Sequence, residues 1–207
     1  MRVDAKEPRR SVVRCGEAQT IQQPGTLEVD MGDTFEPAEG GCACGHVRYQ
    51  VTSEPLIVHA CHCRRCQRQT GSAFAVNALI EADRVRLLTG SVEEVMTPSP
   101  SGKGQTIHRC PLCRVAVWSC YYMGGLKDRV RFVRVGSLDN PDLMPPDVHI
   151  FTSSKQAWVA LPKTDRSVAS FYDPSETWVD ESLERLSVLG AAKNVEEPWG
   201  HAVLSDG

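Results

Sequence analysis

Seven cysteines lie in three short clusters, and thiols at such spacings are suited to holding a metal ion. The densest cluster is Cys61-His62-Cys63-Arg64-Arg65-Cys66, in which three thiols fall within six residues. Cys42-Ala43-Cys44 precedes it, and Cys110-Pro111-Leu112-Cys113 follows it. Close pairs of this kind form disulfides only with strain, whereas zinc sites use these spacings routinely. We therefore expect metal binding rather than a disulfide scaffold.

The seven clustered thiols divide as four plus three, because structural zinc sites take four protein ligands. Cys110 and Cys113 have the spacing of a zinc knuckle and need two further thiols. Cys42 and Cys44 can supply them from one face of an extended segment. The central cluster then keeps three thiols for a second ion. A zinc ion with three protein ligands has an open position for water or substrate, which is typical of a catalytic site.

Other arrangements of the same residues stay open. His62 or His59 could supply a fourth ligand to the central cluster and make it a structural site. Both clusters could serve only to stabilise a small β domain. An iron–sulfur cluster is disfavoured because its usual cysteine spacings are not found in this chain. A different grouping would place four thiols on one ion: Cys42, Cys44, Cys61 and Cys63.

Short alternating segments must position these thiols. Val47, Tyr49 and Val51 alternate with polar residues, and Gln105–Arg109 and Val115–Tyr122 flank the third cysteine cluster. Such segments, separated by turn residues, predict a mainly β domain. Cys120 falls within one of them and is expected to be a small buried hydrophobe. The other expected strands are Leu56–His59, Phe74–Ile80, Val85–Leu88, Val92–Met96, Arg129–Val135, Val148–Phe151 and Ala157–Leu161.

A helix is expected near the C-terminal end, over about 174–189. Asp173 and Pro174 form an N-cap followed by proline at the first helical position, and Gly190 provides a stop. An apolar stripe follows at helical spacing: Val179, Leu183 and Leu186. This amphipathic helix could pack on the domain or on a second subunit, which would make the protein a homodimer. We expect Trp178 to pack in the core.

Composition narrows the function classes. The chain has 207 residues, 41% hydrophobic and 24% charged, with a net charge of -3. No apolar run approaches the ~20 residues of a membrane span, so we expect no membrane partner. The slightly acidic balance argues against a nucleic-acid partner. The N-terminal stretch lacks the apolar core of a secretory signal, so we expect a cytoplasmic protein and leave a nuclear or organellar location open.

Three motifs resemble the glutathione-dependent formaldehyde-activating enzyme family, of which centromere protein V is a relative. Residues 40–49 (GGCACGHVRY) look like the opening of the family's domain, and residues 61–66 followed by 71–74 (GSAF) are similar to its second motif. Cys110-Pro111-Leu112-Cys113 matches the third, and residues 145–155 with Trp158 resemble the C-terminal signature. The resemblance covers roughly residues 38–162. It leaves an N-terminal arm, 1–37, and a C-terminal extension, 163–207.

The resemblance implies a compact, zinc-stabilised β-tent of short antiparallel strands. It implies a structural zinc on Cys42, Cys44, Cys110 and Cys113, and a second zinc on Cys61, Cys63 and Cys66, so two Zn²⁺ per chain. The partners would be a small thiol and an aldehyde, with glutathione as co-substrate. The implied activity is that of a carbon–sulfur lyase making or breaking an adduct of the S-hydroxymethylglutathione type.

The chain departs from the family pattern beside the third motif. An aromatic residue often precedes its first cysteine and a glycine often follows its second, where this chain has Arg109 and Arg114. Glycine permits a tight turn, so we expect Arg114 to reach the turn by another conformation. With Arg64 and Arg65, these arginines could form a positive rim that attracts an anionic thiol.

Two further functions are weighed against the enzyme. One is a zinc-stabilised binding module without catalysis, which should carry a basic extension, whereas residues 1–37 are mixed in charge. The other is a thiol redox protein using Cys110 and Cys113, for which the expected βαβ context is missing.

Overall fold

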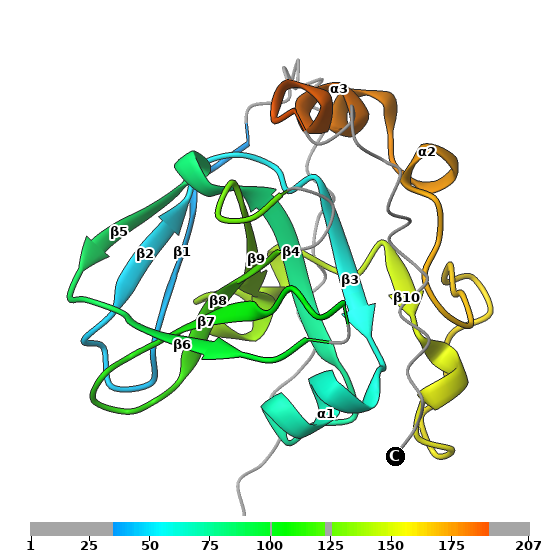
Figure 1. Cartoon of the computed structure of the whole chain (residues 1–207), viewed down its shortest axis with the longest axis horizontal. Coiled ribbons are helices and arrows are strands. Elements are labelled where there is room, and N and C mark those ends of the chain that lie inside the picture. Colours follow the sequence, from blue (N-terminus) through cyan, green and yellow to red (C-terminus); the bar gives the residue numbers. More distant parts are fainter. Residues whose placement is uncertain (1–34, 100, 123–125, 191–207) are drawn as a thin grey trace, which may run out of the picture. The chain divides into compact units, whose positions relative to one another are not determined.

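Antiparallel pairing dominates the computed structural model of this chain, which describes residues 35–99, 101–122 and 126–190 (Figure 1). One sheet contains three strands in the order β1-β2-β5. They span Ala38–Gly41, Arg48–Val51 and Val85–Thr89. Both pairs in this sheet are antiparallel. The Cys42/Cys44 motif follows β1 directly, so this sheet positions the first pair of thiols.

A second sheet contains seven strands in the order β10-β3-β4-β9-β8-β7-β6. They are β3 (Ile57–Cys61), β4 (Ala75–Glu81), β6 (Glu93–Thr97), β7 (Gln105–Arg109), β8 (Ala116–Tyr121), β9 (Val130–Arg134) and β10 (Val148–Ile150). The pairs are antiparallel except β10 with β3, which is parallel. The mainly β prediction is confirmed, and β10 is the exception to its antiparallel strands.

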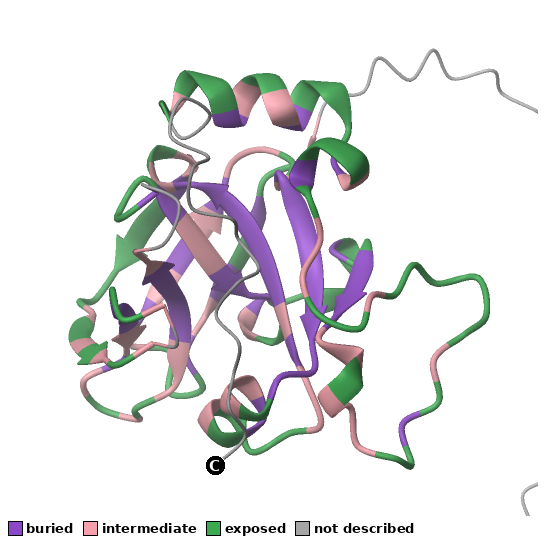
Figure 2. Ribbon diagram, turned by 45° about the vertical axis from the view of Figure 1, so that its right-hand side comes forward, coloured by how far each residue is buried: buried purple, intermediate pink, exposed green. Residues whose placement is uncertain are grey.

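Side-chain alternation explains where the cores lie. Val47, Tyr49 and Val51 are at most 1% exposed, as their alternation with polar neighbours predicts. They belong to a core shared by both sheets, which also contains Trp118. A second core gathers residues of the larger sheet and the C-terminal helices. Figure 2 shows the central strands as buried and the helices above them as largely exposed.

Short helices fill the connections. α1 (Arg64–Thr70) begins three residues after β3 ends, with Cys63 as its N-cap, and Gly71 ends it with φ 68°. The sequence patterns did not predict α1, because its residues are polar apart from Cys66 and lack helical apolar spacing. The 3₁₀ helices are η1 (Ala82–Arg84), η3 (Val135–Ser137), η4 (Pro141–Leu143) and η5 (Thr152–Ser154).

The strands expected at Val85–Leu88 and Val92–Met96 form as β5 and β6. They belong to different sheets, since β5 pairs with β2 and β6 with β7. The predicted strand Ala157–Leu161 is wrong, because these residues form a turn and extended loop without strand pairing.

The predicted C-terminal helix is divided into α2 (Pro174–Thr177) and α3 (Asp180–Val188). Asp173 caps α2 as expected, and Trp178 is buried as expected. Val179 was wrongly assigned to the apolar stripe: it is the N-cap of α3 and is 67% exposed. Arg185 holds α3 to the sheet through two bonds to the Glu81 carboxylate, at 2.8 and 2.7 Å.

Residues 1–34 of the N-terminal arm, which include Cys15, and residues 191–207 lie outside the described residues. The domain boundaries at 37/38 and 162/163 stay predictions.

Candidate metal centres

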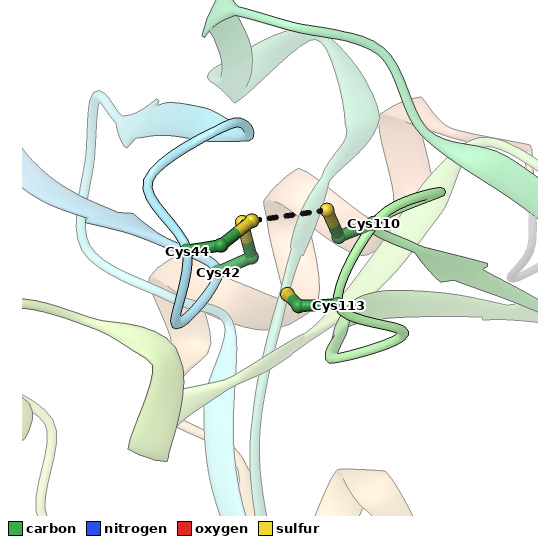
Figure 3. A group of neighbouring side chains, drawn as sticks. All are labelled: Cys42, Cys44, Cys110 and Cys113. Carbon is green, nitrogen blue, oxygen red and sulfur yellow. Dashed lines mark hydrogen bonds between the residues drawn. The ribbon is translucent and has the colours of Figure 1, made fainter.

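Four thiols from two separate turns converge on one point, here called the four-cysteine cluster. Cys42 and Cys44 come from the turn after β1, and Cys110 and Cys113 from the turn after β7 (Figure 3). Their sulfur atoms all lie within 4.8 Å of one another. The Cys42 and Cys44 sulfurs are 3.4 Å apart, and those of Cys44 and Cys110 are 3.7 Å apart. Sulfurs around a tetrahedral zinc ion, with Zn–S near 2.3 Å, lie roughly 3.8 Å apart, so this donor set fits zinc.

Each pair of thiols is presented by the same type of turn. In the first, Cys42 N–H donates to Val47 O at 3.0 Å, and Val47 N–H donates to Cys42 Sγ at 3.3 Å. Gly45 sits at φ 76° in this turn. In the second, Cys110 N–H donates to Val115 O at 2.9 Å. These backbone bonds orient the sulfurs toward the cluster.

Arg114 occupies the second turn in the conformation that glycine would adopt, with φ 65°. The expectation that it would reach the turn by another conformation is wrong. Its N–H donates to Cys110 O at 3.0 Å, and its carbonyl accepts from the Arg109 guanidinium at 2.9 Å. Its side chain pairs with Glu93. These contacts hold a non-glycine residue in the left-handed region, which otherwise costs about 1 kcal/mol.

Hydrogen bonds shift the pKa values of Cys42 and Cys44 in opposite directions. Burial acts to raise the pKa of Cys42, but hydrogen bonds from Val47 N–H and the neighbouring thiols outweigh it and lower the pKa to about 6. A hydrogen bond from the His46 backbone acts to lower the pKa of Cys44, but the other thiols raise it to about 11. Four thiolates this close repel one another unless a cation lies between them.

Three further thiols form the three-cysteine cluster. Cys61 ends β3, Cys63 caps α1 and Cys66 lies in its first turn. Their sulfurs lie within 4.8 Å of one another, and Cys66 N–H donates to Cys63 Sγ at 3.4 Å. Hydrogen bonds from the Cys61 and Cys66 thiols lower the pKa of Cys63 to about 3. The bond with Cys63 raises the pKa of Cys61. This donor set is also suited to a soft divalent metal.

Neither candidate histidine joins the three thiols. The His62 ring turns away and bonds to His149, with Nε2 to Nδ1 at 2.9 Å. His59 bonds to the hydroxyl of Tyr172. Within the part of the chain that the structure describes, no histidine or carboxylate completes the cluster. The alternative that grouped Cys42 and Cys44 with Cys61 and Cys63 is wrong, because these two pairs lie in different clusters. Cys120 is buried, as expected, and lies in neither cluster.

Side chains of Gln67 and Ser154 hold the backbone around the three-cysteine cluster. Gln67 Nε2 donates to His62 O at 2.6 Å and to Ser154 O at 3.1 Å. Ser154 Oγ also donates to His62 O, at 3.2 Å. His149 Nε2 lies 3.4 Å from an Asp165 carboxylate oxygen. These contacts connect the C-terminal signature to the backbone of the central motif.

Two polar residues near this cluster were missed by the sequence patterns. Asn77 on β4 and Arg134 on β9 pair across the sheet and are 6% and 9% exposed. Arg134 donates to Asn77 Oδ1. The available signal was a polar residue among the apolar residues of each predicted strand, and polar residues are seldom buried.

The four arginines of the expected positive rim all have protein partners. Arg109 and Arg114 hold the second turn, as described above. Arg64 donates to Gln67 Oε1 at 2.9 Å, and Arg65 donates to Thr97 Oγ1 at 3.2 Å. Only Arg114 has an acidic partner among these contacts, so the positive rim stays a prediction.

Comparison with known proteins agrees with this geometry. The family model for the glutathione-dependent formaldehyde-activating enzyme matches residues 37–154, a segment that contains both cysteine clusters. The chain belongs to this family. A Halomonas elongata protein, named provisionally as a glutathione-dependent formaldehyde-activating enzyme, is 27% identical over 146 residues, covering 66% of this chain and 90% of that protein.

Among solved structures, a crystal structure of a Rhodobacter sphaeroides protein is 22% identical to this member of the family. The match covers 52% of this chain and 96% of that one, with a TM-score of 0.39. This likeness is too weak to support an argument. In the described ranges, the structure contains no helix with both the length and the apolar character needed to cross a membrane.

Proposed function

We propose that this protein is a zinc-dependent carbon–sulfur lyase that forms or breaks a thiol–aldehyde adduct of the S-hydroxymethylglutathione type. The observation that carries the proposal is the difference in ligand number between the two clusters. Four thiols suit a closed structural zinc, whereas three thiols without a fourth ligand among the described residues suit an ion with an open position. The chain would thus hold two zinc ions.

In this proposal Cys61, Cys63 and Cys66 hold the working ion. A zinc ion bound there would supply the positive charge that keeps an incoming thiol deprotonated. Cys61 and Cys63 are 6% and 8% exposed, whereas Cys66 is half-buried, so Cys66 marks the side from which a substrate reaches the cluster. The buried thiols exclude water from the opposite side.

The chemistry that the chain itself must provide is modest. A thiolate, rather than a thiol, attacks an aldehyde carbon. Holding thiol and aldehyde together replaces a bimolecular encounter with an oriented one. Glutathione and formaldehyde are the proposed thiol and aldehyde, on the strength of the family to which the chain belongs. A cytoplasmic location and a homodimeric state stay predictions.

Replacement of Cys63 by serine tests the proposal. The Cys63→Ser protein should contain one zinc ion instead of two, lose catalysis of adduct formation at least 100-fold and keep its fold, because the surrounding backbone is held by Gln67 and Ser154. Metal analysis, circular dichroism and exchange NMR of ¹³C-formaldehyde with glutathione measure the three quantities.

Cys120→Ser is the matched control, since Cys120 is equally buried but lies in neither cluster. It should keep two zinc ions and full activity. If wild-type protein holding two zinc ions does not accelerate adduct exchange, the enzyme proposal fails and the non-catalytic binding module replaces it. If Cys63→Ser loses both ions and unfolds, the assignment of the two clusters is wrong.

A further inference from the structure

Arg134 is a buried cation beside the three-cysteine cluster, and the oxygen atoms that accept its hydrogen bonds belong to neutral side-chain amides. It is 9% exposed. One guanidinium nitrogen donates to Asn77 Oδ1, and another lies 3.4 Å from Gln69 Oε1. Its Nε is buried and has no hydrogen-bond partner. Among the described residues, no carboxylate lies within 4.0 Å of this guanidinium.

Strand register places Arg134 on the same face of the sheet as Cys61. Cys61 is opposite Ala75 on β4, and His59 is opposite Asn77. Asn77 is in turn opposite Arg134 on β9. Since directly opposite residues share a face, and residues two apart along a strand also do, Cys61, Asn77 and Arg134 all point to one side. α1, which carries Cys66 and Gln69, lies at this side, because Gln69 reaches Arg134.

A buried charge needs a counter-charge, because losing water costs several kcal/mol that neutral amides recover only in part. For Arg134 the candidates are the cluster sulfurs. Burial lowers the pKa of its guanidinium, and the charges of the Cys66 and Cys61 thiols act to raise it. The cluster has the converse need: a divalent ion on three thiolates carries one net negative charge, and a fourth thiolate makes it two.

We propose that Arg134 is the counter-charge of the three-cysteine site and the residue that allows an anionic fourth ligand, a thiolate, to bind there. The proposal rests on the proposed function for the presence of a metal ion in this cluster. Asn77 and Gln69 hold the guanidinium toward the sulfurs, so they act as positioning residues. The unpartnered Nε–H is the donor that remains available to the incoming group.

Arg134 would therefore select ligands by the negative charge on their sulfur atom and not by the rest of the molecule. A thiol that binds as thiolate gains the attraction of Arg134, whereas water and alcohols gain little. Glutathione and neutral 2-mercaptoethanol should therefore depend on Arg134 by similar factors. A residue that recognised the glutathione carboxylates would instead affect glutathione alone.

Arg134→Gln tests the inference with binding measurements on the zinc-loaded protein. We expect the zinc ion of the three-cysteine cluster, which is the ion that Cys63→Ser removes, to bind about 10–100-fold more weakly. Competition with a chelator measures this affinity. A loss of this size is usual when a group that supports a metal ligand is removed. The dissociation constants of glutathione and 2-mercaptoethanol, from titration calorimetry, should rise by similar factors. Arg134→Lys keeps a positive charge but lacks the fork of donors that reaches Asn77 and Gln69, so it should recover only part of both losses.

Arg131→Gln is the matched control, because Arg131 lies on the same strand but on the opposite face, over the Trp118 ring at 4.7 Å. It should leave both constants unchanged. Asn77→Asp is a second test that does not depend on removing the guanidinium. A carboxylate of the same shape beside Arg134 would neutralise it in place, so zinc and thiol affinity should fall as in Arg134→Gln.

Unchanged zinc and thiol affinities in both Arg134→Gln and Asn77→Asp would overturn the inference. A loss confined to glutathione would overturn it as well. Because these readouts need no turnover, they separate the two proposals. If the variants bind the metal more weakly but the wild-type protein does not catalyse adduct formation, only the proposed reaction is excluded. Full activity with unaltered affinities in both Arg134→Gln and Asn77→Asp would exclude only the role of Arg134.

Discussion

The two cysteine clusters differ in what they connect. The four-cysteine cluster draws its thiols from turns of two different sheets, and Cys44 and Cys110 are 66 residues apart. The three-cysteine cluster takes all its thiols from one stretch of six residues at the end of β3. An ion in the first would cross-link distant parts of the chain, whereas an ion in the second would join residues that are already neighbours.

This difference separates stability from function. Closing a long loop removes more freedom from the unfolded chain than closing a short one, so an ion in the four-cysteine cluster would contribute to folding. An ion in the three-cysteine cluster would contribute little, because Cys63 already caps α1 and Gln67 already bonds to His62. A structural zinc ion needs four protein ligands, whereas an ion on which the fold does not depend can keep one coordination position open for substrate.

The largest expected effect is on Cys110, which is fully buried in the four-cysteine cluster. Cys110→Ser should prevent stable folding, because the binding free energy of a structural zinc, on the order of 10 kcal/mol, is folding free energy. Far-UV circular dichroism and metal content measure this outcome. A folded Cys110→Ser protein that keeps two zinc ions would remove the distinction between the clusters.

Metal removal should occur in two steps. A chelator should first take the ion held by three thiols, leaving the secondary structure and about half of the zinc in place. The second ion should leave only with unfolding, since its removal releases the cross-link between the sheets. Zinc release and circular dichroism, followed on one sample, check the order. Simultaneous loss of zinc and structure in a single step would contradict it.

The smallest expected change is in the free energy of unfolding, for substitutions in the two turns of the four-cysteine cluster. Gly45→Ala should cost about 1 kcal/mol, because φ 76° disfavours any residue with a Cβ although nothing lies within 4 Å of the added atom. Arg114→Gly should relieve a similar strain and lose a surface ion pair with Glu93 worth up to about 1 kcal/mol. Its net change should therefore be close to zero.

Denaturant unfolding at fixed zinc concentration measures both variants of the turns. A destabilisation of Arg114→Gly as large as that of Gly45→Ala would show that the Arg114 side chain, rather than the backbone conformation, holds the second turn.

Local sequence patterns were sufficient to predict the strands that carry the four-cysteine cluster. Val47, Tyr49 and Val51 are buried on one face as their spacing predicts, and β7 has the predicted bounds, Gln105–Arg109. Asp173 caps the first C-terminal helix as predicted. These features depend on residues close in sequence, so side-chain periodicity and capping chemistry report them directly.

Patterns failed where long-range contacts decide. β5 and β6 follow one another but join different sheets, and Ala157–Leu161 forms no strand. α1 is polar and short, and its position is set by Gln67 bonds to His62 and Ser154 rather than by an apolar stripe. Val179 interrupts the predicted helix because the chain must turn between buried Trp178 and α3.

The sequence by itself determined the donor chemistry: seven clustered thiols in motifs of known spacing, in a mainly β chain. Only the tertiary structure decided which thiols meet, that His59 and His62 bond elsewhere, and that Arg134 lies buried on the face of Cys61. The reason is that ligand spacing is a local property of the chain. The partners of a buried charge are set by strand register across the sheet, which no single segment contains.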